Sequence, residues 1–208
     1  MPFCARRATE VRRLRPLLLG LLLAAQASAD EVERGRIAAA ALGQVGITTS
    51  YDPSYRRLAY PGGDVPISTG VCADVVVRAL RDIGVDLQRD VHEDMRKHFA
   101  AYPALWGLRR TDRNIDHRRV PNLRRWFERH GWSLTPSRLP DEYLPGDLVS
   151  WRLPNGRPHI GVVSQRRSAD GSRPLVVHNI AVGAQVEDVL LAWTIDGHYR
   201  QPETPAPR

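Results

Sequence analysis

The spacing of apolar residues changes along the chain, and this change limits the fold more than any other sequence feature. Between residues 30 and 131, apart from the stretch 47–70, the apolar side chains recur at helical intervals. From residue 146 onward they fall in short β-rich runs separated by turn residues, at 154–156 and 170–171. Helices followed by a meandering antiparallel sheet predict an α+β domain.

The boundaries of the expected elements follow from capping and turn residues. Pro121 suits the first turn of a helix, and Gly46, Gly84 and Gly131 suit the positions just after helix ends. A stretch without any period, 47–70, predicts a long ordered loop. The expected helices are 30–45, 72–83, 91–102 and 120–131, and the expected strands are 146–153, 159–166, 174–180 and 189–195.

The N-terminus has the three-part layout of a secretory signal peptide. Five arginines precede Leu17, an apolar run follows over 17–25, and Ala27-Ser28-Ala29 forms a small-x-small cleavage signal. The apolar run is shorter than the roughly 20 residues that span a bilayer. We therefore predict cleavage after residue 29, a periplasmic or secreted protein without a stable membrane anchor, and export by either the general or the twin-arginine route.

The remaining chain is predicted to be a single catalytic domain over 30–200, with a proline-rich, frayed tail over 201–208. The formal net charge is +7, but part of it belongs to the predicted signal peptide. A modestly basic surface suits an anionic polymer such as cell wall and gives little reason to expect a nucleic-acid partner.

Cys72 is the only cysteine that remains after signal removal, because Cys4 leaves with the signal. The loop residues 68–70 place Cys72 in the first turn of a helix, where the helix dipole favours a thiolate. An unpaired thiol in an exported protein indicates a reactive residue or an intermolecular disulfide. The alternative is a buried, inert cysteine.

His159 and His178 stand out among the seven histidines. His159 opens one expected strand and His178 lies inside the next, among apolar neighbours that predict burial. A cysteine nucleophile needs a base, and the base needs an orienting partner. We predict His159 as base and His178 as its partner, with Asn179 in that role if the register turns it inward, because successive strand residues face opposite ways. No metal or cofactor is expected, since the histidines lack a ligand spacing.

The ordered set of a helix-start cysteine, "GDLVSW", "PHIGVVS" and "VVHNI" resembles the NlpC/p60 superfamily of papain-like cell-wall cysteine peptidases. The resemblance implies a papain-like core in which the N-terminal helices, with the nucleophile at a helix start, pack on the antiparallel sheet. It implies hydrolysis of amide bonds in peptidoglycan stem peptides through a Cys72–His159–His178 thioester mechanism. Tyr60, about twelve residues before the cysteine, matches a tyrosine typical of the group and is a candidate oxyanion donor beside the Cys72 amide.

More narrowly, "YDPSY", "YPGGDVP", "HEDM" and "NIDHRRVPNL" resemble an uncharacterised bacterial family, DUF1287. The sequence departs from the superfamily at the nucleophile, where Asp74 follows Cys72 two residues later. If its carboxylate points at the thiol it raises the thiol pKa, and if it points away it favours the helix start.

Two further functions share these residues: a thioester-using acyltransferase on the same scaffold, and a non-catalytic cell-wall-binding module. Arg118 and Arg119 are candidate clamps for a substrate carboxylate. They lie in the segment 89–123, which we expect to form the substrate groove together with the loop 51–60. The alternative is that both arginines only pair with Asp112 or Asp116.

Overall fold

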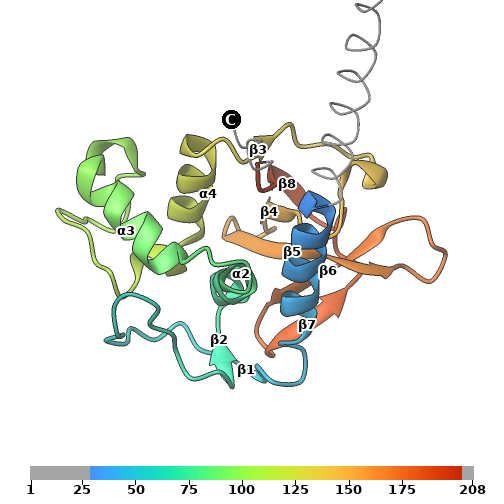
Figure 1. The fold of residues 1–208 in the computed structure, drawn as a ribbon, viewed down its shortest axis with the longest axis horizontal. Helices are drawn as coiled ribbons and strands as arrows, with labels where there is room; N and C mark the ends of the chain where they lie inside the picture. The colour runs from blue at the N-terminus through green and yellow to red at the C-terminus, as the bar shows by residue number, and fades with distance from the viewer. Residues whose placement is uncertain (1–28, 203–208) are drawn as a thin grey trace, which may run out of the picture. The chain divides into compact units, whose positions relative to one another are not determined.

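The computed structural model describes residues 29–202 (Figure 1). Residues Glu33–Pro202 form one compact unit. The predicted signal peptide falls on residues 1–29 and thus, except for its last residue, lies outside the described part. Residues 203–208 of the predicted tail also lie outside it.

The helices occupy the segments that the apolar spacing indicates. The first covers residues 29–42, and Gly46 and Gly131 both have positive φ, of 80° and 75°, as expected for residues that follow helix ends. The third begins earlier than predicted because the Asp86 side chain caps it by accepting a hydrogen bond from the Gln88 N–H. The labelled helices are α2 (Cys72–Arg81), α3 (Leu87–Lys97) and α4 (Val120–Arg129), and the 3₁₀ turns are η1 (Phe99–Ala101), η2 (Asp116–Arg118) and η3 (Pro140–Glu142).

The second half of the chain forms a six-stranded sheet in the order β3-β8-β4-β5-β6-β7, in which every pair is antiparallel. The expectation of an α+β fold with an antiparallel sheet is therefore confirmed. A separate parallel pair joins β1 to β2. The strands are β1 (Ser50–Tyr51), β2 (Thr69–Gly70), β3 (Ser133–Leu134), β4 (Leu148–Arg152), β5 (Pro158–Arg167), β6 (Pro174–Asn179), β7 (Ala184–Glu187) and β8 (Thr194–Tyr199).

The sheet has two apolar faces. On one face Leu148, Ile160 and Val177 pack with α2 and α4, and in Figure 1 α2 is seen nearly along its axis beside β5. On the other face Trp151 and Val163 pack with residues of the segment before β8. Side chains alternate between the two faces along each strand, so the position of a polar residue in β5 or β6 determines the face on which its side chain lies.

The last strand differs from its prediction. The run 189–195 was expected to be a strand, but β8 begins at Thr194 and β7 was not predicted. Leu190 and Trp193 are apolar because they cover the second face of the sheet from a turn, where Leu190 accepts a hydrogen bond from the Trp151 indole. Apolar residues can be buried in a turn as well as in a strand, so the amino-acid composition of this run does not distinguish the two.

Within residues 29–202 no helix is both long enough and apolar enough to cross a membrane.

Asp147 joins the ends of β4 and β8. Its fully buried carboxylate contacts His198 Nε2 at 2.7 Å, Arg200 at 2.7 Å through both nitrogens, and the Leu144 N–H at 2.9 Å. These four contacts give both carboxylate oxygens partners within the protein. The Gly-Asp of the "GDLV" motif thus has a structural role here.

We predict that Asp147→Ala lowers the free energy of unfolding by about 3 kcal/mol, because it leaves the Arg200 charge without its buried partner. The matched control is Asp141→Ala, which removes an ion pair of 3.2 Å to Arg167 from a side chain that is 87% exposed. That change should cost less than about 1 kcal/mol. Urea unfolding of both variants measures the difference, and equal losses would contradict the structural role.

Candidate active site

Cys72 is the first residue of α2, and its thiol is buried, with 6% of the residue exposed. The backbone N–H groups of Ile160, Ala73 and Cys72 itself point at the sulfur and favour the thiolate. Burial outweighs them and raises the pKa of the thiol to about 11. The thiol is therefore protonated at neutral pH, contrary to what the helix start alone favours.

The structure decides between the two orientations considered for the Asp74 carboxylate, toward the thiol or toward the helix start. It turns back to the helix start and accepts the Val71 N–H at 2.7 Å. Arg118 forms a bidentate pair with it, at 2.9 Å through both nitrogens, with both side chains almost fully buried. The Asp74 charge still contributes to the raised pKa of Cys72, after burial.

His159 and His178 lie together. His159 Nε2 is 3.0 Å from His178 Nδ1, and both rings are buried. Trp151 stacks on His159, and Trp193 stands edge-on to both histidines with ring centroids 5.6 and 5.9 Å away. Burial, followed by the neighbouring His178, lowers the pKa of His159 to about 3. Both rings are thus held in a dry aromatic enclosure in which the neutral form is favoured.

Glu187 completes this chain of side chains and was not predicted. Its Oε2 lies 2.9 Å from His178 Nε2. Val176 pairs with Glu187 and projects from the same face as His178, so the hairpin register brings the two side chains together. Burial lowers the pKa of His178, and the Glu187 carboxylate partly opposes this effect. The pairing of β6 with β7 would have revealed Glu187, but β7 was not predicted from the sequence.

The backbone of β5 lies between the histidine pair and the thiol. His159 projects from the opposite face to Ile160, which packs against α2. The Cys72 sulfur accepts from the Ile160 N–H, the peptide group that directly follows His159. Among residues 29–202 the thiol forms no hydrogen bond to a side chain, so the predicted contact between Cys72 and the His159 ring is not made in this conformation.

Asn179 does not orient His159. It faces the other way, where its amide donates to the Gly70 carbonyl at 2.9 Å and its oxygen accepts the Gly183 N–H at 3.1 Å. These bonds tie the end of β6 to the segment that enters α2. The register therefore chooses His178 rather than Asn179 as the partner of His159.

Tyr60 also lies away from the thiol. It packs against His92 of α3, with ring centroids 5.4 Å apart, and its pKa is raised by burial and by Glu93. Tyr51 is the tyrosine near the site, since its pKa is raised first by burial and next by the charge of Cys72. Tyr51 lies nine residues earlier in the sequence than the motif predicts, so only the fold identifies it.

The two predicted clamp arginines are both occupied. Besides Asp74, Arg118 donates to the carbonyls of Asp52 and Ser54, each at 3.0 Å. Arg119 contacts Asp116 at 3.4 Å and lies over the Trp106 ring. These contacts favour the structural alternative for both arginines, although the partner of Arg118 is Asp74 and not the predicted Asp112 or Asp116.

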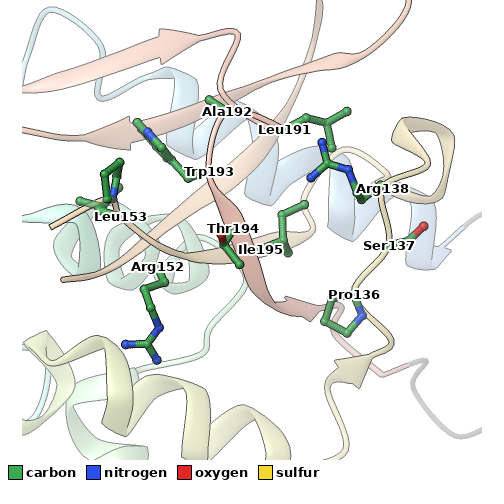
Figure 2. A pocket seen from close by; sticks show the side chains of 11 residues that line it. Pro136, Ser137, Arg138, Arg152, Leu153, Leu191, Ala192, Trp193, Thr194 and Ile195 are labelled. Atoms are coloured by element: carbon green, nitrogen blue, oxygen red, sulfur yellow. The ribbon is translucent and has the colours of Figure 1, made fainter. Parts of the chain in front are cut away.

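A cavity of about 650 Å³ is lined by Trp193, Arg138 and Arg152 among other residues. Figure 2 shows Trp193 at its wall, with Arg138 and Arg152 toward opposite ends of the view. One indole ring therefore both encloses the histidine pair and lines a cavity. Among the described residues, no group of three or more His, Cys, Asp or Glu side chains could hold a metal ion.

The sequence comparisons agree on one family. The family described as "Domain of unknown function (DUF1287)" matches residues 38–201. The chain belongs to this DUF1287 family. It is also 60% identical over 164 residues, 79% of this chain and 80% of the relative, to the Escherichia coli (strain K12) protein YijF, which is described as uncharacterized. No solved structure matches the chain.

We predict that Cys72 of this DUF1287 protein reacts with iodoacetamide slowly at neutral pH. Because only the thiolate reacts, the rate should rise about tenfold per pH unit from pH 7 and level off near the thiol pKa of about 11. The same residue in the urea-unfolded chain should level off near about 8.5. Mass spectrometry of the Cys72 peptide gives both rates. A plateau below about pH 9 in the folded protein would contradict the dominance of burial.

Proposed function

We propose that this DUF1287 protein is an exported cysteine hydrolase with a papain-like, NlpC/p60-type core that cleaves amide bonds in peptidoglycan stem peptides. The observation that carries the proposal is a row of three side chains, in which His159 Nε2 lies 3.0 Å from His178 Nδ1 and His178 Nε2 lies 2.9 Å from Glu187 Oε2. The row begins at His159, and the peptide group that follows His159 contacts the Cys72 sulfur. A buried chain of this kind needs a reason, because each polar group in it costs free energy when left without a partner.

The Glu187 carboxylate fixes which nitrogen of His159 acts as the base. A carboxylate only accepts hydrogen bonds, so His178 Nε2 carries the proton that faces it. His178 Nδ1 is then an acceptor, and His159 Nε2 must donate to it. His159 Nδ1 is consequently left with a free lone pair, which is the form a general base requires.

In the first half of the reaction His159 Nδ1 takes the proton from the Cys72 thiol while the sulfur attacks the amide carbonyl carbon. The tetrahedral intermediate collapses as the carbon–nitrogen bond breaks, and the leaving amine takes the proton from His159. A thioester on Cys72 remains. Because both groups are neutral at rest, proton transfer accompanies attack instead of preceding it.

In the second half a water molecule loses a proton to His159 Nδ1 and attacks the thioester. The carbon–sulfur bond breaks, the carboxylic acid leaves, and the sulfur regains its proton from His159. The Cys72 backbone N–H points at the reacting centre and is one oxyanion donor. The Tyr51 hydroxyl, rather than that of Tyr60, is the second candidate.

The thiol and the His159 ring must come together before this reaction. The sulfur already contacts the peptide group that follows His159, but the His159 ring lies on the face of β5 opposite to α2. The proposal therefore requires the first residues of β5 to turn, so that the His159 side chain reaches the face on which Cys72 lies. Apo enzymes often hold catalytic hydrogen bonds longer than the bound state does. Export to the periplasm or beyond would place the enzyme beside its proposed substrate, the stem peptides of the cell wall.

The proposal is tested by digesting purified sacculi with the protein and identifying released fragments by mass. Cys72→Ala and His159→Ala should each reduce amine release by at least about 10³-fold, because each removes a group that acts in the transition state. The matched control is His98→Ala, since the His98 side chain is half-exposed and its Nε2 lies 3.8 Å from Asp94. The control should retain the parent rate.

The outcomes separate the three functions. New amines that depend on Cys72 support hydrolysis. Acylation of Cys72 by a donor, followed by faster transfer to an added amine than to water, would replace hydrolysis with acyl transfer. Binding to sacculi that is equal in the parent and in Cys72→Ala, with no product from any acyl donor, would leave a binding module and overturn the enzyme proposal.

We further predict that Glu187→Gln lowers kcat about tenfold and leaves KM unchanged. A glutamine can donate as well as accept, so the proton positions on the two histidines are no longer fixed. Glu128→Gln is the matched control, because Glu128 is a similarly exposed carboxylate that pairs with Arg125 at 3.1 Å. Steady-state kinetics across pH measure the effect. An unchanged kcat in Glu187→Gln, or an equal loss in Glu128→Gln, would contradict the role.

A further inference from the structure

A second cavity, of about 700 Å³, lies between the loop that follows β1 and the loop that precedes η2. Four arginines line it, Arg57 from the first loop and Arg109, Arg110 and Arg113 from the second. We call it the arginine groove. Its walls are the two segments that the sequence predicted as groove walls, although its arginines are different from the predicted pair.

The arginines of this groove lack carboxylate partners, unlike most arginines of the described chain. Most other arginines in the sheet and helices pair, as Arg118, Arg129 and Arg173 do with carboxylates at 2.6–2.9 Å. Within the described part of the chain the four groove arginines form no ion pair, and Arg113 only lies over the Tyr60 ring at 5.4 Å. Four like charges held around one cavity repel one another unless an anion joins them.

The floor of the groove is rigid. The Tyr55 hydroxyl donates to Asp112 at 3.0 Å and accepts from the Asn114 amide at 2.9 Å, and the Leu58 N–H donates to Asn114 at 2.9 Å. These bonds join the two walls directly. The arginines therefore extend from a preorganised base, which lowers the entropic cost of ordering them on a ligand.

His92 adds a second indication of a ligand. It lines the cavity, and its buried Nδ1 has no hydrogen-bond partner among residues 29–202. Burial and then the charges of Arg113 and Arg96 lower its pKa. An anion bound in the groove would offset the nearby arginine charges and supply an acceptor for this ring.

We propose that the arginine groove binds a small ligand with two neighbouring phosphate groups. Guanidinium groups bind phosphate and carboxylate oxygens in a bidentate manner, so the number of charges decides between ligands. Asp112 is the one carboxylate among the lining residues, and it is already bonded to Tyr55 and Asn114. A ligand with one carboxylate would leave most of the cationic charge uncompensated, whereas a diphosphate matches it.

Calorimetric titration with inorganic pyrophosphate at low salt tests the proposal. The titration is run in the Cys72→Ala variant, so that binding is read without turnover and stands or falls independently of the hydrolase proposal. Arg109→Ala/Arg110→Ala should weaken pyrophosphate binding at least about tenfold. Arg57→Ala, from the opposite wall, should weaken it as well and provides a second variant if the first does not fold.

The matched control is Arg167→Ala/Arg173→Ala, which removes two positive charges from arginines already paired with Asp141 and Asp188. Its affinity for pyrophosphate should stay within about twofold of the parent. The proposal is overturned if pyrophosphate does not bind, if both double variants lose affinity equally, or if acetate binds as tightly as pyrophosphate.

Discussion

The buried pair between Asp74 and Arg118 is the interaction on which the rest of the structure depends. Asp74 caps the start of α2, and Arg118 of η2 neutralises it while holding the carbonyls of Asp52 and Ser54. Helix start, loop and 3₁₀ turn therefore meet at one guanidinium group. Removing either partner would leave a buried charge uncompensated, which typically costs 3–5 kcal/mol, and Cys72 would lose its fixed position at the start of α2.

Burial, more than the helix dipole, sets the chemistry of the candidate site. Three backbone N–H groups favour the Cys72 thiolate, yet the thiol pKa is about 11 because the sulfur is removed from water. The same effect keeps His159 neutral, with a pKa of about 3. Because the thiol and the His159 imidazole are both neutral, the positions of the protons on the histidines decide whether His159 can act as a base. In the proposed mechanism, Glu187 fixes these proton positions through its contact with His178, which in turn contacts His159.

Two groups of arginines in this protein have different roles. Those that meet carboxylates, such as Arg118 and Arg200, connect secondary structure elements. Those in the arginine groove meet none among the described residues and remain available to an anion. Sequence alone treats the two groups alike, because pairing depends on which loops lie side by side. For this reason the sequence offered Arg118 and Arg119 as clamps, whereas their contacts favour the structural alternative.

The sequence by itself determined the α+β class, the start of α2 at Cys72 and the adjacent strands that carry His159 and His178. Apolar period and turn chemistry are local properties, so they can be read without the fold. Only the tertiary structure decided that Glu187 joins the histidines, that Tyr51 replaces Tyr60 near the thiol, and that burial keeps the thiol protonated. These depend on strand register, loop paths and exclusion of water, which arise from contacts between residues far apart in the chain.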